Sequence, residues 1–142
     1  RDRAQSTLDL LGDDRTSFVL VASPRSDTLD EARYFLDRIR AADLDASGVV
    51  VNRMLPATGV GTERAAMIEA ELAGSPGASA ATALADLAAA AADDEARVAD
   101  LAESAPDAVL VRVPMLNDDV HDLDGLGRVA DLLTADAPSA TS

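Results

Sequence analysis

Asn52 ends the apolar run 48–51, and its side-chain amide offers both a hydrogen-bond donor and an acceptor. These two groups match the N6 and N7 atoms on the edge of adenine. An amide at the end of an apolar strand therefore predicts recognition of a base. The alternative interpretation is that Asn52 caps its strand or turns the chain.

Two other short segments follow apolar runs in the same manner. Ser23-Pro24-Arg25 follows residues 18–22, and Pro114-Met115-Leu116 follows residues 109–113. In open α/β sheets, ligands bind beyond the carboxyl ends of the strands. We therefore expect both segments and Asn52 to meet at one edge of one sheet, where Arg25 would face phosphate, a dimer partner or an acidic side chain.

The elements that position these residues follow from hydrophobic periodicity. The apolar runs 18–22, 48–52 and 109–113 are typical of parallel strands buried on both faces. After the first of them, Thr28 and Glu31 form a capping-box pattern. A helix is predicted there by the apolar residues Leu29, Ala32, Phe35, Leu36 and Ile39. Strand, helix and strand form a right-handed βαβ unit.

A helical insertion is expected between the second and third strands, at about residues 57–105. It comprises a helix over 63–73, a break at 74–77 and an alanine-rich helix over 80–92 that continues or is jointed into 93–103. Its expected apolar stripe consists of Leu84, Leu87, Ala91, Ala92, Val98 and Leu101.

Two further helices are predicted at 4–11 and 123–133. The predicted fold is thus α/β, a three-layer, partial doubly wound sheet of at least three parallel strands with inserted helices. It occupies residues 1–135, and a disordered polar tail follows at 136–142.

The composition excludes several chemistries. There is no lysine, so the Gly-Lys-Ser/Thr sequence of a phosphate-binding P-loop does not occur. No cysteine and a single histidine, His121, argue against a metal site. The acidic pairs at 13–14, 93–94 and 118–119 are expected to be solvated surface. No catalytic residue and no metal ligand is therefore assigned.

A net charge of −14 repels nucleic acid and anionic lipid surfaces. No stretch approaches the ~18 apolar residues of a membrane span, and no signal peptide is recognisable at the N-terminus. We therefore expect a cytoplasmic protein with no nucleic-acid partner and no direct membrane insertion. The chain starts with Arg1 rather than Met, which suggests a piece of a longer protein.

The segments 16–24, 29–33, 48–56 and 113–120, in this order and spacing, resemble the carboxy-terminal half of the ArsA/Get3 family. These are anion-pump-driving and tail-anchored-protein-targeting ATPases. The resemblance covers residues 4–133 and is weakest over 57–105. It implies that this chain is a fragment of a P-loop NTPase-like fold of the SIMIBI type, without the P-loop itself.

The resemblance also implies roles for individual residues. Asn52 would contact adenine, while Pro114, Met115 and Leu116 would close over the base. Arg25 takes a position in the nucleotide pocket that is often acidic in relatives. The chain also departs from the family pattern at Asp119-Val120, where relatives have Glu-Val, and at His121-Asp122, where a Gly is common nearby.

The family's P-loop, switch aspartates and magnesium ligand would lie upstream of Arg1. Only when joined to that half would this chain belong to an ATPase that uses ATP or ADP with magnesium, and alone it would bind neither strongly. The implied partners are the missing N-terminal half or a paralogous subunit, in a homo- or heterodimer. In relatives, the helices corresponding to 63–103 form a subdomain for clients or partners. Here the large apolar side chains are few among many alanines, which argues against a client groove and favours helices that pack on one another.

Other functional classes stay open. The chain is alternatively a non-catalytic α/β protein–protein interaction module derived from such an ATPase. Partitioning-type ATPases share the Val-Asn strand end and are the closest competitor. A flavodoxin-like receiver needs a lysine, which this chain lacks.

Overall fold

The computed structural model describes residues 11–13 and 15–135. Residues 4–10 of the predicted first helix and the predicted tail at 136–142 lie outside the described residues. The elements, in chain order, are β1 (Phe18–Ala22), α2 (Ser26–Arg40), β2 (Ala46–Met54), α3 (Thr62–Leu72), α4 (Ala78–Glu103), β3 (Val109–Pro114) and α5 (Leu123–Thr134).

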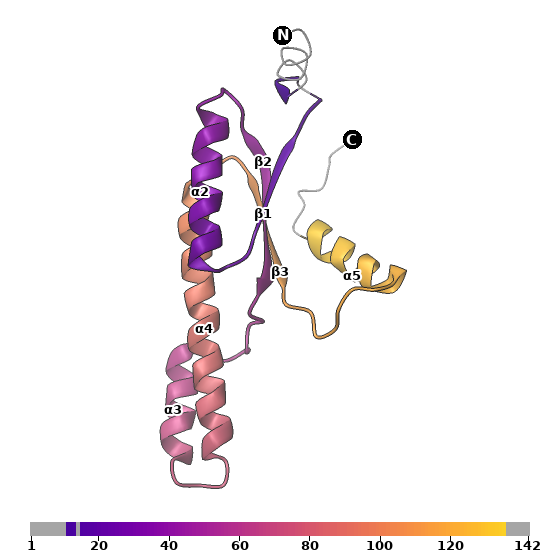
Figure 1. Ribbon diagram of the computed structural model, residues 1–142. Coiled ribbons are helices and arrows are strands. Elements are labelled where there is room, and N and C mark those ends of the chain that lie inside the picture. The colour runs from indigo at the N-terminus through magenta and orange to yellow at the C-terminus, as the bar shows by residue number, and fades with distance from the viewer. Residues whose placement is uncertain (1–10, 14, 136–142) are drawn as a thin grey trace.

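The three strands form one parallel sheet in the order β1-β2-β3. The predicted α/β class and the parallel strands are therefore confirmed. Because the strand order advances in one direction and parallel crossovers share one hand, α2 and α4 cover the same face of the sheet (Figure 1). The described strands contain no reversal of winding, so they do not show the doubly wound part of the prediction.

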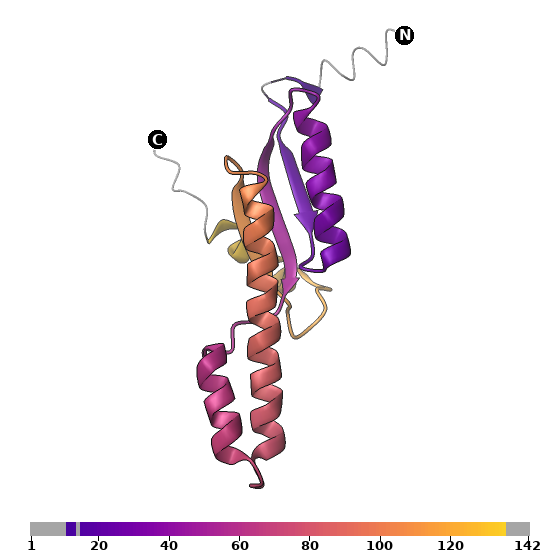
Figure 2. The same ribbon diagram turned by 90° about the vertical axis from the view of Figure 1, so that its left-hand side faces the viewer.

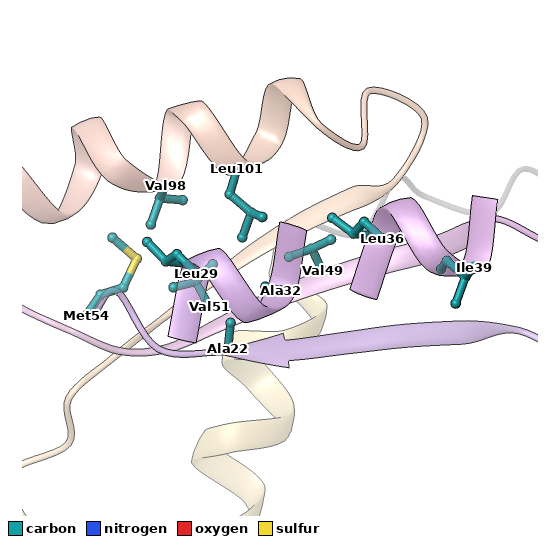
Figure 3. Close-up of a cluster of buried hydrophobic side chains, with 10 residues drawn as sticks. All are labelled: Ala22, Leu29, Ala32, Leu36, Ile39, Val49, Val51, Met54, Val98 and Leu101. Atoms are coloured by element: carbon teal, nitrogen blue, oxygen red, sulfur yellow. The ribbon is translucent and has the colours of Figure 1, made fainter. Parts of the chain in front are cut away.

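The core lies between the sheet and the two helices on this covered face. Val49 and Val51 of β2 point into it, together with Leu29 and Leu36 of α2 and Leu101 of α4 (Figure 3). All five side chains are at most 2% exposed. Alternate strand residues point to opposite faces, so burial of Val49 and Val51 directs Val50 and Asn52 to the other face.

That second face, which we call the open face, is only partly covered. α5 follows β3 and lies on the opposite side of the sheet from α2 (Figure 1). Val111 and Val113 of β3 are buried, whereas Val19 and Val21 of β1 are 59% and 64% exposed. The prediction of strands buried on both faces is therefore wrong for β1 within the described residues, because no described element packs over its outer side chains.

The helical insertion is a hairpin that extends beyond the end of the sheet. α3 runs beside the first half of α4, and the second half of α4 runs beside the sheet (Figure 2). α4 is one continuous helix of 26 residues, which decides between the continuous and jointed predictions. Only alanines are buried in the hairpin part: Ala65 of α3 and Ala81 and Ala88 of α4.

Two details of the predicted helices are wrong. α2 begins at Ser26, and its N-cap Arg25 makes no side-chain capping bond, so Thr28 and Glu31 are not a capping box. Thr28 Oγ1 instead lies 2.9 Å from Ser23 O and 3.0 Å from Arg25 O. Phe35, expected in the buried stripe of this helix, is 46% exposed.

The stripe expected along the alanine-rich helix is correct only toward its C-terminal end. Val98 and Leu101 are fully buried, because this part of α4 packs on the sheet. Leu87 is 38% exposed, because it lies in the half of α4 that packs only against α3. Among the helices described here, none is long and apolar enough to cross a membrane.

Candidate functional site

A groove lies on the open face, between the sheet, the loop after β3 and α5, and its volume is about 730 Å³. We call it the open-face groove. Four of the five predicted site residues line it: Asn52, Pro114, Met115 and Leu116. The parallel register explains this convergence, because Asn52 of β2 pairs with Val113 of β3, next to Pro114.

Asn52 is exposed on the groove wall and is held by the backbone that follows it. The Arg53 N–H donates to Asn52 Oδ1 at 2.8 Å. Within the described part of the chain, no hydrogen bond engages the Asn52 amide nitrogen, which leaves its two N–H groups for a ligand. The oxygen retains a second lone pair, so the amide can still accept one hydrogen bond.

Arg53 has a left-handed backbone, with φ of +64°. Residues other than glycine rarely adopt this backbone conformation, which persists where the surrounding structure enforces it. The register between β2 and β3 shifts at the same point, between Asn52 and Met54. Asn52 therefore still follows the regular alternation of the strand, and the bulge changes the alternation after it, so that Met54 rather than Arg53 is buried.

The loop after β3 is tied to the end of β2. The Met115 N–H donates to Met54 O at 2.8 Å, which extends the pairing by one bond beyond the strands. Met115 is 43% exposed and Leu116 is half-buried, so both present apolar surface next to the Asn52 amide. Apolar walls with a few fixed polar groups are typical of small-molecule sites.

Arg25, the fifth predicted residue, does not line the open-face groove. Its guanidinium pairs with the Asp27 carboxylate through Nε–Oδ1 at 3.1 Å and Nη2–Oδ2 at 2.9 Å. These hydrogen bonds raise the pKa of Arg25 and lower the pKa of Asp27. Of the alternatives for Arg25, the structure therefore shows the exposed ion pair.

The structure brings further residues to the groove besides the predicted site residues. Arg53, Asp118 and Asp119 also line the groove. Asp118 and Asp119 are exposed, as expected for solvated acids, but they add negative charge at the groove rim. The adjacency of Arg53 to Asn52 was the available signal for the first of them, whereas the groove position of the two acids depends on the path of a loop.

Asp94 corrects another prediction. It was expected to be solvated together with Asp93, but it is 6% exposed and bonded to Leu55 and Arg97. Helix periodicity places it on the side of α4 that faces the strand-end loops, whereas Asp93 is exposed.

Comparison with known proteins adds no family name, because neither a protein-family model nor a curated protein matches this sequence.

Proposed function

We propose that this chain is the adenine-recognition portion of an ArsA/Get3-like ATPase, which couples ATP hydrolysis to anion transport or to targeting. The convergence of Asn52 with Pro114, Met115 and Leu116 on the open-face groove supports this proposal. The proposal includes a P-loop NTPase-like fold of the SIMIBI type and a cytoplasmic location. The absence of cysteine is compatible with that compartment.

In this proposal, the Asn52 amide reads the base edge. Its N–H donates to adenine N7, and Oδ1, while keeping its bond from the Arg53 N–H, accepts from the N6 amine. Met115 and Leu116 pack against the ring, and Pro114 fixes the start of their loop. Arg53, which also lines the groove, is the positive charge nearest to Asn52 in sequence.

The chemistry of phosphate transfer would come from outside this chain. ATP or ADP with magnesium needs a P-loop lysine and an acidic magnesium ligand, and the chain has no lysine. Asp118 and Asp119 at the groove rim would repel phosphate rather than bind it. We therefore assign base recognition to this chain and hydrolysis to a P-loop half, with the missing N-terminal half or a paralogous subunit as the partner.

Base selectivity tests the proposal directly. In the full-length protein, the dissociation constants for ADP and for inosine diphosphate are compared, because inosine carries an oxygen in place of the N6 amine. We expect ADP to bind about 5- to 150-fold more tightly, the range of a bidentate amide–base pair. Asn52→Ala should reduce this ratio to about one.

Strain that the substitution introduces at Arg53 would change both dissociation constants by the same factor, so it would not change their ratio. Asn117→Ala is the matched control, since Asn117 lies in the neighbouring loop but does not line the groove. An unchanged ratio in Asn52→Ala would contradict the adenine assignment.

The second candidate function is a non-catalytic α/β protein–protein interaction module. The exposure of Val19 and Val21 supports it, together with that of Leu126 on α5, because large exposed apolar patches mark interaction surfaces. Leu126→Asp, at an exposed residue of α5 that does not line the groove, should then abolish copurification with a partner subunit and leave the dissociation constant for ADP unchanged. Intact copurification, with loss of ADP selectivity in Asn52→Ala, would favour the first function. The signature sequence of the P-loop upstream of Arg1 would separate ArsA/Get3-like from partitioning-type ATPases.

A further inference from the structure

Asp94 is the one charged side chain that is buried in the part of the chain that the structure describes. Both oxygens of its carboxylate are used, by donors from different elements. Oδ1 accepts from Arg97 Nη2 at 2.8 Å, and Oδ2 accepts from the backbone N–H of Leu55 at 3.2 Å. A buried carboxylate is costly unless hydrogen-bonded, so this arrangement constrains both partners.

Arg97 extends the connection to a second loop. While Nη2 binds Asp94, Nε donates to the Pro24 carbonyl oxygen at 3.0 Å. Pro24 lies in the loop after β1, and Leu55 begins the loop after β2. Two residues of α4, one turn apart, therefore hold the loops that follow two neighbouring strands.

The third strand-end loop joins through the backbone. Leu55 directly follows Met54, whose carbonyl oxygen accepts from the Met115 N–H at 2.8 Å. Leu55 is also three residues after Asn52. Through these bonds, the position of α4 is linked to the Asn52 amide and to the apolar loop beside it, the two components of the proposed base site.

Asp94 also lies where α4 changes surroundings. Toward its N-terminus, Ala81 and Ala88 are buried in the half that runs beside α3. Toward its C-terminus, Val98 and Leu101 are part of the core against the sheet (Figure 3). Asp94 and Arg97 therefore bond to two strand-end loops at the point where the hairpin part of α4 passes into the part that packs on the sheet.

We propose that Asp94 and Arg97 are positioning residues, which set the geometry of Asn52 and the loop after β3 from α4 and couple the α3–α4 hairpin to the base site. The coupling to nucleotide rests on the proposed function. The positioning itself is a property of the described hydrogen bonds and is testable without a nucleotide.

Two substitutions separate the parts of this arrangement. Arg97→Lys keeps the charge, but a single ammonium on an unforked chain does not hold both the Asp94 carboxylate and the Pro24 carbonyl in the same geometry. Asp94→Asn keeps the shape, but one of its two acceptors becomes a donor, so Leu55 or Arg97 loses its partner.

Matched controls lie on the same surface of the protein. Arg112 and Glu95 form an exposed ion pair, 2.9 Å between Nε and Oε2, that connects β3 to α4, and in the described structure neither side chain forms a hydrogen bond to a strand-end loop. Arg112→Lys and Glu95→Gln therefore repeat the two chemical changes at a neighbouring site.

The first measurement is nuclear magnetic resonance of the full-length protein. We expect Arg97→Lys and Asp94→Asn to shift the side-chain amide resonances of Asn52 and to speed hydrogen exchange at the Met115 N–H about tenfold. Neither group bonds to Asp94 or Arg97, so a merely local loss would not move them. The controls should leave both unchanged.

The second measurement is the dissociation constant for ADP, taken at a temperature where every variant is fully folded. We expect it to rise about 2- to 30-fold in Arg97→Lys, the range of mutations along a coupled network, and to stay constant in Arg112→Lys. The melting temperature, recorded in parallel, shows whether folding explains the change.

Unchanged Asn52 and Met115 signals in Arg97→Lys would overturn the positioning role, even if Asp94→Asn fails to fold. If the wild-type protein shows no base selectivity, the proposed function fails, but the two resonance signals still decide whether α4 positions Asn52. Moved resonance signals with an unchanged ADP constant would overturn the coupling.

Discussion

At the scale of single residues, the Arg25–Asp27 pair gives a prediction about pH. Hydrogen bonds from the Arg25 side chain, and then from the Thr28 N–H, lower the pKa of Asp27. A carboxyl with a lowered pKa in the folded state stabilises the fold above its unfolded value of ~3.9, and this contribution is lost as the pH falls through the folded value.

We therefore expect Arg25→Gln to raise the titration midpoint of Asp27 in a carboxyl-detected magnetic resonance titration. The midpoint of Asp13 serves as the internal control, because its pKa is lowered by a separate partner, Arg15. An Asp27 midpoint that stays in place, or an Asp13 midpoint that moves with it, would be inconsistent with the ion pair in solution. High salt should reduce the shift, since both groups are exposed.

The sequence predicted some residues of the candidate site and not others for a physical reason. Asn52 and the loop from Pro114 follow strands, and parallel strands bring their carboxyl ends to one edge, so their convergence follows from local patterns. The ion pair of Arg25 with Asp27 depended on its side-chain rotamer. Asp94 is buried against Leu55, which lies 39 positions away in the sequence, and no local pattern reports such a distant contact.

At the scale of elements, the two faces of the sheet predict different costs for the same substitution. Val51 is fully buried between β2 and the helices, whereas Val21, also in a strand, is 64% exposed on the open face. Val51→Ala should lower the free energy of unfolding by about 2 kcal/mol, because it removes buried methyl groups and leaves a cavity. Val21→Ala should lower it by less than half as much.

Urea denaturation of both variants checks this difference, provided that the slope against urea is unchanged. Equal losses would mean that Val21 is covered in solution, by a second copy or by residues outside the described ranges. The comparison therefore also reports on whether the open face is exposed in the protein as it exists.

The boundaries of the elements show the same division between local and distant causes. The strands β1 and β3 and the helix α5 begin where their periodicity begins, and Asp122 caps α5 by accepting from the Gly125 N–H at 2.7 Å. The early start of α2 at Ser26 was not predicted, because Thr28 bonds backward to the loop instead of capping the helix. The exposure of Phe35 was not predicted, because helical spacing does not reveal how far the sheet extends beside β1.

At the scale of the whole molecule, exposed apolar surface favours association, whereas net charge opposes it. The sequence predicted the α/β class and the parallel sheet, since these follow from apolar runs alternating with helical patterns. It did not predict that one face would stay open, because coverage of a face depends on all elements together. Repulsion from the net charge of −14 opposes association of such surfaces, and it also opposes folding.

The balance of charges predicts how stability depends on salt. The chain has 26 acidic residues and 12 arginines, so acidic side chains outnumber basic ones by 14. Of the seven ion pairs in the described residues, only Arg97–Asp94 has a buried member, and exposed pairs contribute little. Repulsion among the remaining carboxylates therefore outweighs the attraction of the pairs.

Because the screening length falls from ~30 Å at 0.01 M salt to ~8 Å at 0.15 M, added salt should relieve this repulsion. We expect the melting temperature, followed by circular dichroism, to rise by about 2–5 °C over that range. Sodium chloride and potassium fluoride should act equally if screening is the cause. A melting temperature that falls with salt would instead show that the ion pairs stabilise the fold more than the excess of acids destabilises it.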